Sequence, residues 1–383
     1  MRIFIAAQNQ ITESSINEAI YSFISKFKEL SSDNFVLSEP DVIWFLTGGS
    51  EHNAIKRIEP QKKYCFIASN SDNSWASATE VKAHLNEKGI YTKIFDLDKL
   101  NSISEIRDYL YDRPEPEVSK LGMIGKASDW LVASIPEQEL LEEVLDIKIL
   151  KFNWEDVNNI NTDLNQNIFE SFFNILNYQP DVDCIELLGK LKILTDKNNL
   201  DALAIDCYSL INENRISACI PVSFFNTMNF PVACEGDLCS AAGMIVFSRI
   251  KKSVPWLANL SYVNKEYAIF SHCTVPLNIL DSFEIAPHYE SGYNAAIKGL
   301  LKKQQVTIFR IDHKLEYCFI ALGEIVDSGN IIEGCKTQAK IKMSAKSLFL
   351  LREFPLGNHH LIVEGDHTDV LAEYFTNKGF RIF

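Results

Sequence analysis

The segment PVACEGDLCSAAGMIVFSRI, residues 231–250, shows most plainly how this chain folds. Apolar residues lead into Glu235, Gly236 permits a tight turn, and Asp237 is suited to cap the helix that the Ala-, Leu- and Met-rich run 238–250 predicts. Glu235 is therefore expected at the carboxyl end of a strand, where open α/β sheets bind ligands. The alternative is an ordinary connection whose acidic side chains are simply solvated.

The same alternation of strand and helix extends from this segment to the N-terminus. Short apolar runs and amphipathic stretches follow one another over residues 1–116 and again over residues 117–253, on either side of a polar, Pro-containing turn. This pattern is typical of βαβ units with parallel sheets. We therefore expect two Rossmann-like, doubly wound α/β domains over these ranges, the second carrying Glu235.

After residue 253 the rhythm changes, because runs typical of strands follow closely without helices between them until 369–378. LFLL at 348–351 is one of the runs assigned to a strand. Closely spaced strands of this kind indicate a barrel or a sandwich. The expected third domain, 254–383, is therefore a barrel or a sandwich, and it carries His272 and His359.

Composition narrows the class of protein. The 383 residues are 46% hydrophobic and 23% charged, as in globular chains, and 51 acidic against 37 basic side chains give a net charge of −14. This charge repels nucleic acid and anionic membranes and suits a small neutral ligand or a metal ion. No apolar run approaches the roughly 18 residues of a membrane span. Nine cysteines without CxxC spacing indicate reduced thiols and a cytoplasmic location.

Histidines concentrate in GNHHLIVEGDH, residues 357–367, which holds three of the eight in the chain. Adjacent residues of an extended segment point to opposite sides, so that one of His359 and His360 can bind a metal while the other packs. His367 is expected to begin the last helix. His272 ends an apolar strand, and it is either a buried structural histidine or part of a site.

Six segments in order give the chain a resemblance to the L-fucose/L-arabinose isomerase superfamily, in particular to its shorter fucose-isomerase-like members. The resemblance implies two Rossmann-like units followed by a β-barrel-like C-terminal domain, which agrees with the strand and helix pattern described above. The segments are spread over most of the chain: LTGGSE at 46–51, NSWASATEVKAHL at 73–85, LGMIGKASDWLVAS at 121–134, ACEGD at 233–237, HCTVP at 272–276 and GNHHLIVEGDH at 357–367.

The resemblance also implies a divalent metal, Mn²⁺ or Mg²⁺, and the interconversion of an aldose and its ketose. That reaction passes through an enediol, so a base must move a proton between carbons while a cation stabilises charge on the two oxygens. In the family a Glu and an Asp are both metal ligands and the acid/base pair. Glu235 matches that Glu, and His359 matches the family's histidine ligand, with His360 as the alternative.

The family's second carboxylate is missing from this chain. It normally follows 24 residues after the Glu, where WLANL supplies Asn259 instead. An amide oxygen can coordinate a hard cation but cannot exchange protons as a carboxylate does. Asp237, Asp281 and Glu284 are near in sequence, but nothing in the sequence places them at the site.

Two functions follow from these residues. The first is a metal-dependent sugar isomerase or closely related carbohydrate enzyme, with Glu235 and Asn259 at the catalytic positions. Its metal ligands would be Glu235, Asn259 and His359 or His360, and His272 would contact the substrate. The second is a non-catalytic, sugar-binding homologue. A neutral sugar is expected, since no Arg/Lys cluster accompanies the motifs.

The resemblance further implies a homo-oligomer, a trimer or hexamer, in which the first domain of one subunit covers the pocket of its neighbour. Trp75 would then stack on the sugar, because aromatic rings pack well against sugar C–H faces. The alternative is that Trp75 fills the core of its own domain.

Overall fold

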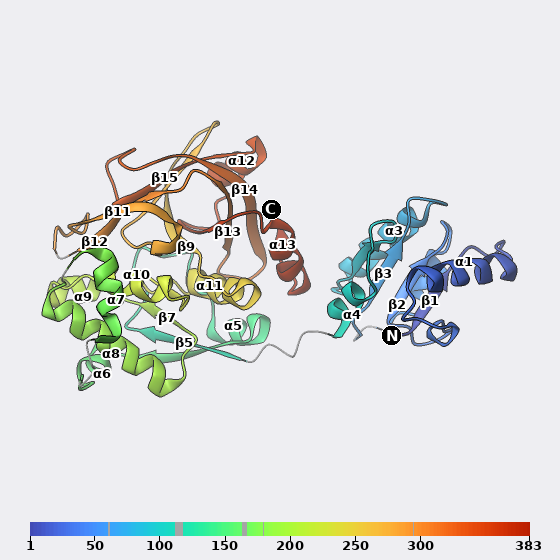
Figure 1. The fold of residues 1–383 in the computed structure, drawn as a ribbon, viewed down its shortest axis with the longest axis horizontal. Coiled ribbons are helices and arrows are strands. Elements are labelled where there is room, and N and C mark those ends of the chain that lie inside the picture. The colour runs from blue at the N-terminus through green and yellow to red at the C-terminus, as the bar shows by residue number, and fades with distance from the viewer. Residues whose placement is uncertain (60–61, 112–117, 163–166, 179, 294) are drawn as a thin grey trace. The chain divides into compact units, whose positions relative to one another are not determined.

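The structure is a computed structural model that describes residues 1–59, 62–111, 118–162, 167–178, 180–293 and 295–383. The chain forms two compact units, Met1–Glu117 and Val118–Phe383 (Figure 1). Residues 118–253 and the β-rich remainder, expected as separate domains, lie together in the second unit.

The first unit is built on a parallel sheet with core clusters on both faces. Phe23 belongs to one cluster and Val81 to the other, so helices cover both sides. The four described strands follow chain order, without the reversal of order expected of a doubly wound sheet. The elements are β1 (Ile3–Ala6), α1 (Glu13–Lys26), η1 (Ser32–Asn34), β2 (Val42–Phe45), α2 (Glu51–Ile55), β3 (Cys65–Ala68), α3 (Ser74–Glu87), β4 (Lys93–Asp96) and α4 (Ser104–Tyr111).

The second unit contains another parallel sheet, whose strand order is β6-β5-β7-β8. The order reverses between β5 and β7, so the carboxyl ends of the strands open a crevice there. The elements are β5 (Ser119–Ile124), α5 (Gln138–Leu145), β6 (Ile147–Phe152), α6 (Trp154–Asn158), α7 (Asn167–Leu176), α8 (Val182–Asn198), β7 (Ala202–Ile205), α9 (Cys207–Asn214), α10 (Cys219–Thr227), β8 (Val232–Ala233) and α11 (Leu238–Lys251).

The β-rich region forms a closed barrel of six strands in the order β13-β16-β9-β10-β15-β14, with β14 pairing back to β13. Helix α11 is buried because it contacts both the sheet, at β7 and β8, and the barrel, at β13 and β16. The elements are β9 (Trp256–Val263), β10 (Ala268–His272), η2 (Leu277–Ile279), β11 (Leu280–Ala286), β12 (Ala296–Leu301), β13 (Gln305–Ile311), β14 (Tyr317–Ser328), β15 (Thr337–Met343), α12 (Ala345–Glu353), β16 (His359–Glu364), α13 (Thr368–Asn377) and β17 (Arg381–Ile382).

The assignment of LFLL to a strand is wrong, since these residues lie in α12. The Ser344 side chain caps this helix by accepting the backbone N–H of Ser347. Leu348 and Leu351 share the buried face, as helical spacing requires, and a short apolar run alone does not reveal that spacing. In the described part of the chain, no helix combines the length and the apolar character needed to cross a membrane.

Candidate metal centre

The turn after β8 directs Glu235 into the interior. Glu235 and Gly236 have φ angles of 61° and 65°, and a Cβ at Gly236 would lie 2.6 Å from the Lys126 carbonyl oxygen. Only glycine therefore fits at that position. Asp237 then caps α11, its Oδ1 accepting the Ser240 N–H at 2.7 Å. The predicted strand, turn and helix are present, and the Glu235 side chain is buried rather than solvated.

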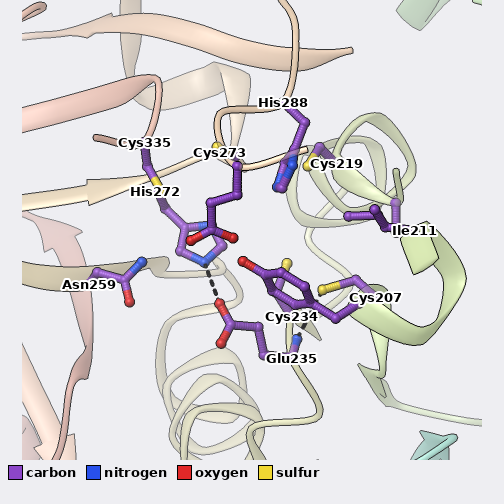
Figure 2. A pocket seen from close by; sticks show the side chains of 13 residues that line it. Cys207, Ile211, Cys219, Cys234, Glu235, Asn259, His272, Cys273, His288 and Cys335 are labelled. Atoms are coloured by element: carbon purple, nitrogen blue, oxygen red, sulfur yellow. Dashed lines mark hydrogen bonds and ion pairs between the residues drawn. The ribbon is translucent and has the colours of Figure 1, made fainter. Parts of the chain in front are cut away.

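Three side chains from separate elements converge at this turn. Each of Glu235, His272 and His359 offers one ligand atom, and these atoms lie within 4.8 Å of one another. Glu235 Oε1 is 3.5 Å from His359 Nε2 and 3.9 Å from His272 Nε2, the second of which is drawn in Figure 2. All three side chains are buried, and the group could hold a metal ion.

The His359 ring is oriented by a buried carboxylate. Its Nδ1 lies 2.8 Å from Asp237 Oδ2, so that Nδ1–H donates to Asp237 and Nε2 keeps its lone pair toward Glu235. This buried Nε2 has no hydrogen-bond partner among the described residues, an arrangement that costs free energy unless an ion or a proton satisfies it. A carboxylate that orients a histidine in this way is the usual support of a metal-binding imidazole.

Without a cation, a proton takes that position on His359. Burial acts to lower the pKa of this imidazole, but the hydrogen bond to Asp237, the ion pair with Glu235 and the charges of these carboxylates raise it to about 9. Burial likewise acts to raise the pKa values of Glu235 and Asp237, yet the neighbouring His359 holds both below their usual range. Both carboxylates are therefore ionised, and Glu235 is the one that belongs to the group able to hold a cation.

A buried guanidinium holds Asp237 in place. Arg310 Nη1 lies 3.7 Å from Asp237 Oδ2 and donates to the His359 carbonyl, while Nη2 donates to Ser134 Oγ at 2.7 Å. Arg310 thereby links the loop after β5 to the barrel strand that carries His359. The sequence predicted Asp237 as a helix cap and did not place it at the site. In the structure, Asp237 also orients the His359 ring.

Trp130, in the loop after β5, fixes the orientation of the Glu235 carboxylate. Its indole Nε1–H donates to Glu235 Oε2 at 2.7 Å, which leaves Oε1 facing the two imidazoles. The Trp130 side chain is 54% exposed and contacts Tyr208 edge to face, with ring centroids 4.6 Å apart. The Trp130 ring is therefore accessible to a ligand from solvent.

His272 faces Glu235 as a neutral imidazole. Burial and the nearby His359 lower its pKa to about 3. Its Nδ1 lies 2.9 Å from Thr274 Oγ1, so Nδ1–H can donate to that hydroxyl and leave Nε2 free for a cation. The Thr274 N–H also points at Nδ1, at 3.2 Å, which favours the other tautomer when no cation is bound.

Asn259 and His360 occupy different places. Asn259 on β9 lines the same cavity as Glu235 (Figure 2) and lies opposite His359 in the strand register. Its Oδ1 accepts a hydrogen bond from Asn358. His360 points the other way, packing on Phe270 with ring centroids 5.5 Å apart. Its Nδ1–H donates to the Asn358 carbonyl at 2.9 Å. Of the adjacent histidines, the structure brings His359 to Glu235.

Other acids considered from the sequence lie elsewhere. Asp281 and Glu284 are exposed on β11, and Glu284 pairs with Lys298. Trp75, at the start of α3 in the first unit, is 37% exposed and so does not fill the core of that unit. Its stacking on a ligand of a neighbouring subunit stays a prediction.

Glu235, alone of the three residues of the candidate metal group, lines a cavity of about 580 Å³ with polar and aromatic walls. No Lys or Arg is among the described residues that line it. Glu290 lines both this cavity and a smaller one behind it, and burial raises the pKa of its carboxyl group. The walls include Trp130, Tyr208, Glu235, Asn259, Ser261, Ser271, Tyr289, Glu290, Glu333, Cys335 and Asn358.

Trp130, Tyr208 and Glu290 are site residues that the sequence reasoning missed. A signal for the first two was present, because Trp130 follows β5 and Tyr208 follows β7, and ligands bind at the carboxyl ends of such strands. That rule was applied only to the strand before Glu235. Glu290 has no comparable signal, since it lies in the connection between β11 and β12.

The contribution of Asp237 can be measured. In Asp237→Asn the amide can still cap α11, but an NH₂ group facing His359 Nδ1 would place the ring proton on Nε2. We expect Mn²⁺ affinity to fall about 10–100-fold, as on loss of other orienting partners of metal ligands. Equilibrium dialysis measures this change.

The matched control is Asp206→Asn. Asp206 is also a buried capping residue, accepting the Ser209 N–H at 3.1 Å at the start of α9. This variant is expected to retain metal affinity. Equal losses in both variants would show that Asp237 acts only through helix capping.

Comparisons with known sequences do not identify a family or a function for this chain. No sequence model of a protein family matches the chain, and no curated protein matches it significantly.

Proposed function

We propose that this protein is a metal-dependent aldose–ketose isomerase, or a closely related enzyme acting on a small neutral carbohydrate. The observation that carries the proposal is the buried group of Glu235, His272 and His359, in which Asp237 orients the Nε2 of His359 toward Glu235. These three residues would hold the metal, with Asn259 contributing an amide oxygen from the same cavity.

The donor set indicates the class of metal. Mg²⁺ prefers oxygen ligands and retains several waters, whereas imidazoles suit first-row transition ions. One carboxylate and two imidazoles therefore favour Mn²⁺ or a related ion over Mg²⁺. A bound cation of this kind would supply Lewis-acid stabilisation of negative charge on two neighbouring substrate oxygens.

The cavity supports a neutral sugar as ligand. The exposed faces of Trp130 and Tyr289 can pack against sugar C–H groups, while amide, hydroxyl and carboxylate groups on the walls can hydrogen-bond to hydroxyls. A phosphate would need Arg or Lys partners, which the described walls lack. The volume is within the range of small-molecule sites.

Proton transfer between adjacent carbons requires groups that exchange protons at the cavity. Glu235 is ionised and can accept a proton, but the amide of Asn259 cannot take the second role. Glu290 lines the same cavity, and partial burial raises the pKa of its carboxyl group above the usual value, the direction that favours a proton donor. We assign the second role to Glu290.

We expect Glu290→Gln to lower kcat by about 100-fold, at the low end of the usual contribution of a general acid or base. Metal content should not change, because Glu290 is outside the Glu235, His272 and His359 group. Steady-state assays on an aldose panel, with metal analysis of the same samples, measure both quantities. Glu333→Gln, which removes another carboxylate from the wall, should leave kcat unaltered. If the two variants behave alike, Glu290 has no special role.

A second candidate is a non-catalytic, sugar-binding homologue, and Asn259 is the observation that favours it. The experiment that separates the two is metal titration of the purified chain together with assays of ketose formation from a panel of aldoses. The isomerase proposal expects saturable Mn²⁺ binding and turnover of at least one aldose. Metal and sugar binding without turnover would support the second candidate.

A further inference from the structure

Five of the nine cysteines surround the smaller cavity behind the metal centre (Figure 2). All nine are free thiols. The chemistry proposed above uses none of them. The five are Cys207, Cys219, Cys234, Cys273 and Cys335.

Two of these thiols are brought together by the barrel. Strands β10 and β15 are antiparallel, and His272 at the end of β10 lies opposite Thr337 at the start of β15. Cys273 directly follows His272 and Cys335 lies two residues before Thr337, so both lie just beyond the end of the ladder. The Cys335 thiol is within hydrogen-bond reach of the Cys273 sulfur, and the two side chains pack in one small cluster.

Access to solvent distinguishes this pair from the other cysteines. Cys335 is partly exposed, whereas the Cys273 side chain is buried. Cys207 and Cys234 are also in hydrogen-bond contact, but both are buried. Of these two described cysteine pairs, Cys273 and Cys335 are therefore the pair with a partly exposed member.

We propose that Cys273 and Cys335 form a reversible disulfide in the presence of a peroxide. One sulfur attacks a peroxide oxygen, the O–O bond breaks, and a sulfenic acid and one water result. The second thiol then attacks that sulfur, the S–O bond breaks, and a second water leaves with the thiol proton. Two thiols lose two electrons and two protons in total, and the peroxide gains them.

The disulfide would join two parts of the site. Cys335 ends a segment that Gln338 holds by accepting the N–H groups of Ile331 and Ile332 and by donating to the Cys335 carbonyl. Residues 332–335 form one wall of the larger cavity. A bond from this wall to Cys273 would attach it covalently to the strand that ends in His272.

The test uses the full-length, metal-free chain treated with hydrogen peroxide, followed by alkylation of free thiols and peptide mapping without reductant. We expect the wild type to lose two alkylatable thiols, to yield a peptide cross-linked between Cys273 and Cys335, and to recover both thiols with dithiothreitol. Cys335→Ser and Cys273→Ser should form no such cross-link. Cys219→Ser, which alters a neighbouring sulfur in the same cluster, should still form it.

The proposal is overturned if Cys273 and Cys335 of the wild type both stay alkylatable. It also fails if Cys335 is oxidised alone to a sulfinic acid, or if the cross-link joins Cys207 and Cys234. Mapping of the wild type decides these outcomes even if a serine variant does not fold. Because the protein is metal-free and no sugar is added, the result is independent of the isomerase proposal.

Discussion

His359→Gln and Glu235→Gln are each expected to weaken Mn²⁺ binding by more than about 100-fold, because losing only an orienting partner of a ligand already costs 10–100-fold. Each variant removes one of the three groups that converge at the site. Isomerase activity should be lost in both. Isothermal titration of the metal-free proteins with Mn²⁺ measures the affinity, and an aldose panel measures the activity.

The matched control is the adjacent histidine. His360→Gln changes the same residue type one position along β16, but this ring packs on Phe270 and Phe319 away from Glu235. We expect it to retain the metal, although it will reduce stability because a buried ring is lost. If the His360 variant loses the metal and the His359 variant retains it, then His360 is the ligand and the proposed assignment to His359 is wrong.

Thermal unfolding provides a second measurement on the same proteins. A ligand that binds only the folded state stabilises it, by about 2.7 kcal/mol at a concentration of 100 Kd. Mn²⁺ should therefore raise the Tm of the wild type, and a chelator should reverse the change. The His359 variant should show no such shift. If Mn²⁺ does not change the Tm of the wild type at any concentration, the proposed metal centre is rejected.

Asn259→Asp has the second large expected effect. An aspartate at this position keeps the acceptor that Asn358 uses and adds a negative charge to the cavity lined by Glu235. We expect tighter Mn²⁺ binding. If wild-type catalysis already uses Glu290, activity should stay the same or fall, because an additional carboxylate would compete for protons and metal.

The non-catalytic alternative predicts the opposite change in activity. A general acid or base contributes about 10²–10⁴ in rate, so restoring a carboxylate at residue 259 would create or strongly raise isomerase activity. Asn358→Asp is the control, since it adds the same charge at the other end of the amide pair. If the wild type, Asn259→Asp and Glu235→Gln neither bind metal nor convert any aldose, the isomerase proposal fails and the resemblance reports only ancestry of the fold.

Local sequence was sufficient for features that depend on neighbouring residues. The turn at Glu235 and Gly236 and the capping by Asp237 follow from the residue types themselves. The opposite orientations of His359 and His360 follow from the two-residue period of a strand. The change to closely spaced strands indicated a barrel or a sandwich, and a closed six-stranded barrel is present.

The tertiary structure alone decided which side chains meet. Glu235, His272 and His359 come from a turn and two barrel strands, and their convergence depends on barrel closure and on the packing of α11 between sheet and barrel. The hydrogen bond from Trp130 to Glu235 and the second role of Asp237 have the same origin. Capping and residue spacing act over a few neighbours, whereas strand register and helix packing are set by the whole core, so only the folded chain shows which distant groups share a site.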